Sequence, residues 1–358
     1  MPIQKLTITE FLQRSALHPI LDVRSPGEYA QAHIPGAHSF PLFSDEERKT
    51  VGTAYKHQSR EHAIKFGLDF FGPKMRSMVE KVEEIMKSEN RKVKNEEGLS
   101  SKKIFVHCWR GGMRSGAVAW LLDVYGFDVY LLEGGYKAYR NWVLQQFEMA
   151  YDCKIIGGYT GSGKTPILQQ LKKQGEQIID LEGLARHKGS AFGALGQPPQ
   201  PRQEMFENLL ATELFQKQEK KCFWLEDESQ RIGVLNIPLA FWKMMRTKQV
   251  YFIDIPFEER LHYITIEYGG HEKEKLVNAV IRIQKRLGPV ETKTAIGFLL
   301  EDNYRECFSI LLRYYDKHYG KALYNRENIT ALLNKIDCSA VDTISNTEKI
   351  LTCETVLT

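Results

Sequence analysis

The sequence lacks several features that would assign it to a specialised class of protein. No apolar run approaches the roughly 18 residues that a membrane-spanning helix needs, so no membrane segment is expected. Residues 1–12 do not have the charged-then-apolar layout of a secretion signal. The six cysteines are dispersed without a Cys-x-x-Cys pair, which suggests neither a disulfide framework nor a zinc site, and no metal ligands are assigned. These absences favour a cytoplasmic protein.

What the sequence does contain is the composition of an ordinary globular protein. Its 358 residues are enough for two domains, each with its own core. A hydrophobic content of 42% and a charged content of 26% are typical of folded domains. The formal net charge of +4 suits a polyanionic partner such as nucleic acid but does not require one.

The first part of the chain, residues 1–147, alternates short apolar runs with helical patterns. Residues 19–24, 104–107 and 128–132 have the pattern of buried strands. Apolar residues between Met75 and Met86 recur at helical spacing and indicate an amphipathic helix. This alternation predicts an α/β domain with a doubly wound parallel sheet. Active loops of such sheets lie beyond the carboxyl ends of the strands.

A loop with one cysteine follows the strand at 104–107. Residues 108–115 read Cys-Trp-Arg-Gly-Gly-Met-Arg-Ser, and the glycines allow backbone N–H groups to converge on an anion. We expect the two guanidinium groups to lower the pKa of the thiol, and a helix that begins after Ser115 to favour a negative sulfur. A buried structural cysteine is the alternative. The candidate catalytic residues are Cys108, Arg110, Gly111, Gly112 and Arg114.

The second part of the chain, residues 148–358, opens with a strand at 153–156 that leads into a phosphate-binding pattern. Residues 158–165 satisfy Gly-x-x-x-x-Gly-Lys-Thr, and a helical segment follows. The ligand stays open: a nucleotide, or a diphosphate carried by another substrate. Further strands are expected at 177–181, 222–226 and 250–255, and a largely helical chain beyond Pro256. The candidate phosphate-binding residues are Gly158, Gly161, Ser162, Gly163, Lys164 and Thr165.

Acidic residues end several of these apolar runs. An NTPase needs such a carboxylate to organise Mg²⁺, and Asp180, Asp227, Glu228 and Asp254 qualify by position. Each of them could equally be a helix cap or a surface carboxylate. Asp180 and Glu228 are retained as supporting candidates because the segments 180–190 and 226–233 should converge near the phosphate loop.

A basic face is predicted on a helix near the C-terminus. Arg282, Lys285 and Arg286 are spaced to share one side of that helix, where they could contact a nucleic-acid backbone. A solvated charged face is the alternative.

In combination these motifs resemble a known family. Residues 21–29 and 33–37 are similar to the rhodanese (sulfurtransferase) signature, and residues 132–136 to the motif that closes that domain. Cys108 takes the position of its catalytic cysteine. A rhodanese domain followed directly by a phosphate-loop domain resembles the tRNA 2-selenouridine synthase family. The resemblance covers about residues 6–300.

The resemblance implies a substrate and two co-substrates. The family replaces the sulfur of a 5-substituted 2-thiouridine at the wobble position with selenium, in tRNAs that accept Lys, Glu or Gln. Selenophosphate from a separate enzyme would be the selenium donor, and geranyl diphosphate would first alkylate the sulfur. By this resemblance Cys108 would carry selenium as a Cys–S–Se⁻ perselenide. The phosphate loop, helped by Arg231, would hold the diphosphate, with Mg²⁺ as a further candidate cofactor.

Two other functions fit parts of the sequence. A small-molecule kinase or NTPase fused to a rhodanese sulfurtransferase domain would use the same phosphate loop for a nucleotide. A non-enzymatic reading treats the first domain as a partner-binding module and the phosphate loop as a nucleotide switch.

Overall fold

The computed structural model describes residues 3–92, 102–217 and 222–357. The chain divides into two compact units, Met1–Gln145 and Gln146–Thr358. Each unit is built on its own parallel sheet, so the predicted α/β fold class is confirmed.

Within the described residues of the first unit, the sheet has five parallel strands in the order β1-β5-β4-β2-β3. The strands predicted at 19–24, 104–107 and 128–132 form at these positions. The strands are β1 (Gln4–Leu6), β2 (Ile20–Asp22), β3 (His38–Ser39), β4 (Lys103–His107) and β5 (Asp128–Leu132).

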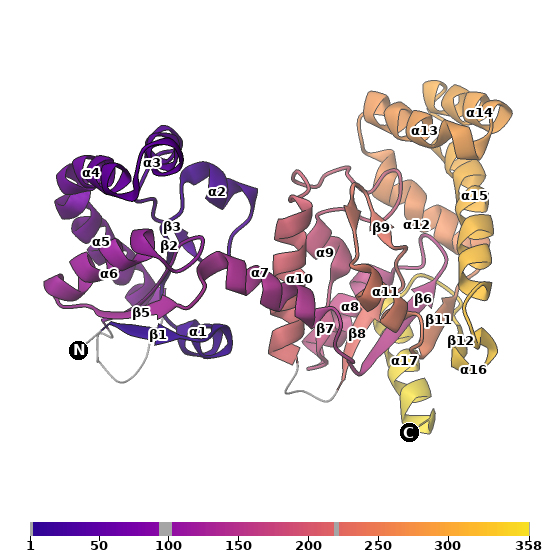
Figure 1. Ribbon diagram of the computed structural model, residues 1–358. Helices are drawn as coiled ribbons and strands as arrows, with labels where there is room; N and C mark the ends of the chain where they lie inside the picture. The colour runs from indigo at the N-terminus through magenta and orange to yellow at the C-terminus, as the bar shows by residue number, and fades with distance from the viewer. Residues whose placement is uncertain (1–2, 93–101, 218–221, 358) are drawn as a thin grey trace. The chain divides into compact units, whose positions relative to one another are not determined.

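Helices cover both faces of this sheet, as the alternating side chains of β4 require (Figure 1). Ile104 and Val106 join the buried cluster formed by the α5 and α6 side chains. Phe105 points to the opposite face, where Phe11 of α1 meets it edge-on at 5.3 Å between ring centroids. The helices are α1 (Ile8–Ser15), α2 (Pro26–Gln31), α3 (Asp45–His57), α4 (Arg60–Phe71), α5 (Met75–Lys92), α6 (Met113–Tyr125) and α7 (Gly135–Gln146), with a 3₁₀ turn at Gly72–Lys74.

Within the described residues of the second unit, five parallel strands follow the order β12-β11-β6-β8-β7. The strand β8 lies directly beside β6 and runs parallel to it. The residues that follow these two strands are therefore neighbours at the carboxyl-terminal end of the sheet. A short antiparallel hairpin pairs β9 with β10. The strands are β6 (Cys153–Gly158), β7 (Ile178–Ile179), β8 (Phe223–Glu226), β9 (Arg231–Ile232), β10 (Leu235–Asn236), β11 (Val250–Asp254) and β12 (Leu333–Asp337).

The helices of the second unit cover the sheet and extend beyond it. On one face α8 and α17 share a buried cluster with β6, β8, β11 and β12 (Figure 1). A separate apolar cluster joins α12, α13, α14 and α15. The helices are α8 (Lys164–Lys173), α9 (Leu181–Ala185), α10 (Gln203–Lys217), α11 (Leu239–Met245), α12 (Phe257–Gly269), α13 (Lys273–Leu287), α14 (Pro289–Leu300), α15 (Tyr304–Tyr324), α16 (Ile329–Leu332) and α17 (Thr343–Leu357).

One element beyond Pro256 differs from the expected helical chain. Residues Leu333–Asp337 form β12, which pairs with β11 along its whole length. Among the described residues, no helix combines the length and the apolar character needed to cross a membrane.

Candidate functional site

The thiol loop, residues 108–112, leaves the carboxyl end of β4 and leads directly into α6. The helix starts at Met113 rather than after Ser115, so Ser115 lies inside its first turn. From there its hydroxyl reaches back to the sulfur, with 3.2 Å between Ser115 Oγ and Cys108 Sγ. The predicted loop-to-helix arrangement forms, but the helix begins earlier than predicted.

Hydrogen bonds favour the thiolate form of Cys108. Burial alone would raise the pKa of this thiol, which is only 3% exposed. The Ser115 hydroxyl and the backbone N–H groups of Ser115, Arg110 and Gly112 outweigh burial, and the pKa falls below the usual value of 9.0. By contrast, burial raises the pKa of both Cys153 and Cys307 to about 12. Of these three thiols, Cys108 is therefore the one whose surroundings favour the thiolate, while its burial is what the structural alternative expects.

The arginine side chains of the loop act differently from the prediction. Arg114 pairs with Glu28 in the first turn of α2, at 2.7 Å between Nη1 and Oε2. Arg110 has an exposed side chain and stabilises the sulfur through its backbone N–H. The lowered pKa thus comes from dipoles of the loop and the helix start rather than from the two guanidinium charges.

Close packing fixes the shape of the thiol loop. Gly111 has a φ of +64°, and a Cβ there would lie 2.7 Å from the carbonyl oxygen of Leu132. A Cβ on Gly135 would clash with the carbonyl oxygen of Cys108 in the same loop, whereas one on Gly134 would lie 2.8 Å from the Cβ of Ala138. This explains why the closing motif at 132–136 accompanies the cysteine loop.

The phosphate loop, residues 158–165, connects β6 to α8 as its spacing predicts. Gly161 and Gly163 have φ values of +81° and +73°, which a residue with a side chain rarely adopts. Gly163 caps α8, so the first backbone N–H groups of that helix face the loop. The ammonium of Lys164 donates to the carbonyl oxygen of Gly158 at 3.0 Å.

The long helix α15 braces this loop, which the sequence did not predict. The hydroxyl of Tyr319 accepts from the N–H of Gly158 at 3.2 Å and donates to Asp227 Oδ2 at 2.6 Å. Arg326 forms a buried ion pair with the same carboxylate. Asp227, one of the acids at strand ends, therefore holds α15 against the loop.

A second contact from α15 reaches the loop through an arginine. Asp316 binds Arg260 with two hydrogen bonds, at 2.9 and 2.8 Å. Arg260 also donates to the carbonyl oxygen of Thr160 at 3.0 Å. The backbone of the loop is thus held in place before any ligand arrives.

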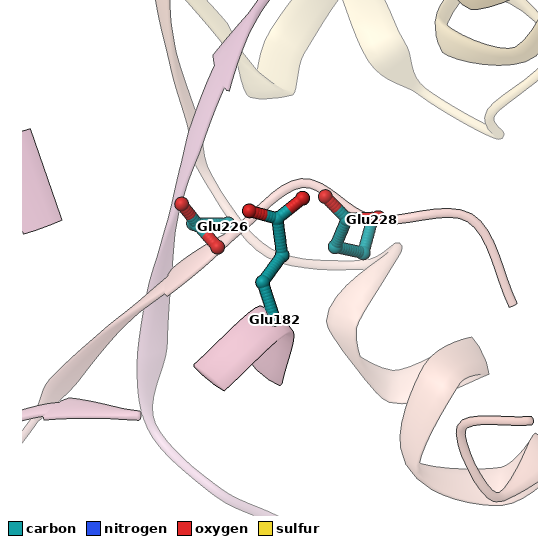
Figure 2. A group of neighbouring side chains, drawn as sticks. All are labelled: Glu182, Glu226 and Glu228. Atoms are coloured by element: carbon teal, nitrogen blue, oxygen red, sulfur yellow. The ribbon is translucent and has the colours of Figure 1, made fainter. Parts of the chain in front are cut away.

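Three glutamates converge beside the phosphate loop and form what we call the carboxylate cluster: Glu182, Glu226 and Glu228. One carboxylate oxygen from each lies within 4.8 Å of the others (Figure 2). Glu182 Oε2 accepts from the hydroxyl of Thr165 at 3.0 Å. Burial, then repulsion from a neighbouring carboxylate, raises the pKa of Glu182 to about 9 and that of Glu228 to about 8.

The other candidate acids have separate roles. Asp180 caps α9, where it accepts a hydrogen bond from the N–H of Gly183 at 2.7 Å. It therefore has the helix-cap role that was the alternative to organising Mg²⁺. Asp254 pairs with Lys335 at 2.6 Å. Sequence reasoning selected Glu228 but not Glu182 or Glu226, although it did expect their two segments to converge here.

The predicted basic residues lie at the surface. Arg231 is exposed, and its Nε donates to the carbonyl oxygen of Gly233 at 2.9 Å within its own hairpin. Arg282, Lys285 and Arg286 are exposed on α13. Burial and the charge of Arg282 lower the pKa of His187, which follows α9.

The protein thus combines two kinds of unit: one parallel sheet carries the thiol loop of a sulfurtransferase-like domain, and the other carries a loop of the P-loop type. The family model for the rhodanese-like domain matches residues 7–141, and the model for the tRNA 2-selenouridine synthase AAA domain matches residues 151–348. The chain belongs to the tRNA 2-selenouridine synthase family, which confirms the resemblance of its motifs.

Relatives of this family match both units. A tRNA 2-selenouridine synthase from Shewanella woodyi is 33% identical over 91% of this chain and 93% of its own length. Those from Hydrogenovibrio crunogenus and Shewanella pealeana are 36% and 38% identical, over 75% and 76% of this chain and 76% of each relative. A solved N-terminal domain from Clostridium difficile 630, described as that of an ATP/GTP-binding protein, is 38% identical over 39% of this chain and 99% of its own, with a TM-score of 0.33.

Proposed function

We propose that this protein converts the 2-thiouridine at the wobble position of tRNA into 2-selenouridine. Its family and the names of its relatives support this substrate class. The observation that carries the proposal is one chain that combines a phosphate loop with a cysteine of lowered pKa. The reaction would take place in the cytoplasm on tRNAs that accept Lys, Glu or Gln, with selenophosphate supplied by a separate enzyme.

In the first step the phosphate loop would bind geranyl diphosphate. The sulfur of 2-thiouridine attacks the first carbon of the geranyl chain, the carbon–oxygen bond breaks to release diphosphate, and the N3 proton of the base is lost to water. Loop N–H groups and Lys164 stabilise the negative charge that develops on that leaving group. Thr165 stands at the start of α8 and would lie beside the same phosphates. No nucleotide hydrolysis is needed.

In the second step selenium replaces the alkylated sulfur. Selenide, freed from the phosphorus of selenophosphate, attacks C2 of the alkylated base, and geranylthiol leaves with one proton because an alkylated sulfur departs more readily than a thiocarbonyl sulfur. Selenophosphate holds selenium at the selenide level, so a perselenide on Cys108 would require a two-electron oxidant. We therefore assign the Cys108 thiolate to the phosphoryl group: a sulfur–phosphorus bond forms as the selenium–phosphorus bond breaks, and water then releases phosphate.

The thiol loop suits an anionic donor of this kind. Backbone N–H groups of Arg110, Gly112 and Ser115 surround the sulfur and can donate to phosphate oxygens. The exposed residues Arg282 and Lys285 on α13 would contact the tRNA backbone, where each contact adds affinity that depends on salt.

A nucleoside assay tests the first step. Lys164→Ala should suppress geranyl transfer to 2-thiouridine tRNA, because it removes the charge that stabilises the departing diphosphate. Lys172→Ala is the matched control, since Lys172 is exposed on the last turn of the same helix. Unchanged geranyl transfer in Lys164→Ala contradicts the diphosphate role.

Nucleotide hydrolysis is the competing activity for this loop. ATP hydrolysis that saturates with substrate and does not respond to tRNA would favour the kinase or NTPase alternative. Cells that lack the gene should contain no 2-selenouridine in their tRNA, as measured by mass spectrometry of nucleosides. Persistence of that nucleoside would contradict the whole assignment.

A further inference from the structure

The carboxylate cluster has the composition of a hard-cation site. Glu182 comes from α9, Glu226 ends β8, and Glu228 lies two residues further on (Figure 2). Three separate positions of the chain thus aim acidic groups at one point. We propose that Glu182, Glu226 and Glu228 bind one divalent cation of the Mg²⁺ or Mn²⁺ type next to the phosphate loop.

An orphaned side chain points to this ligand independently of the clustering. Glu226 is fully buried, and neither of its carboxylate oxygens has a hydrogen-bond partner within the described residues. A buried polar group without a partner is costly, and a buried charge more so unless it is paired or coordinates a metal. The acids around it raise its pKa by repulsion, and the nearby Thr165 hydroxyl and Lys164 ammonium, which lower that pKa, do not offset its burial. A bound cation supplies the missing partner.

The charges around the carboxylate cluster also favour a bound cation. Burial raises the pKa of Glu226 well above its usual range, and Glu182 is the next largest cause. Lys164 lowers the pKa values of all three glutamates, but it does not cancel the effect of burial. A dication supplies more positive charge at shorter range than this one ammonium can.

The donor set selects the kind of ion. Its three glutamates offer oxygen ligands alone, which suit Mg²⁺ or Mn²⁺ rather than metals that prefer sulfur or nitrogen. Backbone closes over the site at Gly189, where a Cβ would lie 2.8 Å from Glu182 Oε1 and 3.1 Å from Glu228 Oε2. The hydroxyl of Thr165 orients Glu182 from the phosphate-loop side.

The position of the cluster gives the ion a role in the proposed function. Thr165 ends the phosphate loop and touches Glu182, so an ion held by the cluster would lie beside a bound diphosphate. There it would bridge phosphate oxygens and neutralise the leaving group. This last point rests on the proposed diphosphate site, whereas cation binding itself does not.

Mn²⁺ binding to the purified full chain tests the proposal. The loss of the free Mn²⁺ signal in electron paramagnetic resonance measures binding with no tRNA or diphosphate present. We expect one Mn²⁺ per chain, displaced by Mg²⁺. Glu226→Gln and Glu228→Gln should each weaken binding at least about tenfold, since the loss of groups that merely support metal ligands already costs that much. Circular dichroism checks that the variants fold.

A matched variant removes the same charge elsewhere in the unit. Glu176 accepts a hydrogen bond from Trp224 near the opposite end of β8, and Glu176→Gln can keep that bond while leaving Mn²⁺ affinity unchanged. Absence of Mn²⁺ binding to the unmodified chain, or equal affinity in folded Glu226→Gln, would overturn the proposal. A titration with inorganic diphosphate distinguishes the cation site from the proposed diphosphate site. Tighter Mn²⁺ binding in its presence supports contact between the ion and the diphosphate. Unchanged binding leaves the cation site intact and contradicts the diphosphate role.

Discussion

Replacing Ser115 with alanine removes the hydroxyl closest to the reactive sulfur, which also lies 3.1 Å from the carbonyl oxygen of Gly112. The Ser115 hydroxyl lies 3.2 Å from Cys108 Sγ and is the strongest of the groups that lower the pKa of this thiol. A hydrogen bond to a charged group contributes about 1.5–3 kcal/mol. Since one pKa unit corresponds to about 1.4 kcal/mol, Ser115→Ala should raise the pKa of Cys108 by about one to two units.

The sign of this effect determines the pH profile. Because the pKa of Cys108 lies below its usual value of 9.0, the thiolate persists at a lower pH than in a free cysteine, and it is lost as the pH falls through the lowered pKa. In Ser115→Ala the same loss should begin at a higher pH. At a pH below both pKa values the variant should therefore react about ten to a hundred times more slowly with an alkylating reagent.

Alkylation by iodoacetamide, followed by mass spectrometry of the Cys108 peptide, measures this midpoint. Cys153 and Cys307, with pKa values of about 12, serve as internal references that stay protonated. Arg114→Ala should move the midpoint less than Ser115→Ala, because Arg114 is paired with Glu28. Equal midpoints in the unmodified chain and Ser115→Ala would refute the role of the hydroxyl.

One further substitution in each unit tests a buried polar contact. Arg24→Ala should lower the free energy of unfolding by about 3–5 kcal/mol in chemical denaturation, because it leaves the buried carboxylate of Asp22 uncompensated. A loss below about 1 kcal/mol would contradict this view of the pair. Tyr319→Phe should weaken binding of inorganic diphosphate about two- to tenfold in calorimetry, because Gly158 and Asp227 lose their shared hydroxyl. Unchanged affinity would show that the brace is dispensable.

Local patterns predicted the parts of the site that depend on neighbouring residues. The phosphate loop forms where its glycine spacing places it, since positive φ values and a helix start are encoded within a few positions. Cys108 follows its predicted strand for the same reason. Predicting these features does not require knowing which distant segments of the chain meet in the fold.

Groups that meet only through tertiary folding could not be selected from the sequence. The partner of Arg114 is Glu28, which is 86 residues away in the chain. Glu226 is distinguished from other acids by its burial and its lack of a partner, both properties of the folded unit. Tyr319 looks like an ordinary aromatic residue of a helix until α15 is placed against the phosphate loop.

The missed strand has a similar explanation. In β12, Ile336 is the buried residue, and Lys335 and Asp337 are exposed, because the strand lies at the edge of its sheet. Such a strand lacks the apolar run that marked the buried strands, and its identity comes from pairing with β11.

The proposal assigns geranyl transfer to the phosphate loop and the selenium step to the thiol loop. One nucleoside measurement on Cys108→Ser tests this assignment most directly. The purified variant is incubated with 2-thiouridine tRNA, geranyl diphosphate and selenophosphate, and the digested nucleosides are separated by mass. We expect the S-geranyl nucleoside to accumulate and 2-selenouridine to be absent, because the thiolate serves the selenium step alone. Formation of 2-selenouridine by this variant, or loss of the geranylated nucleoside, would contradict the account.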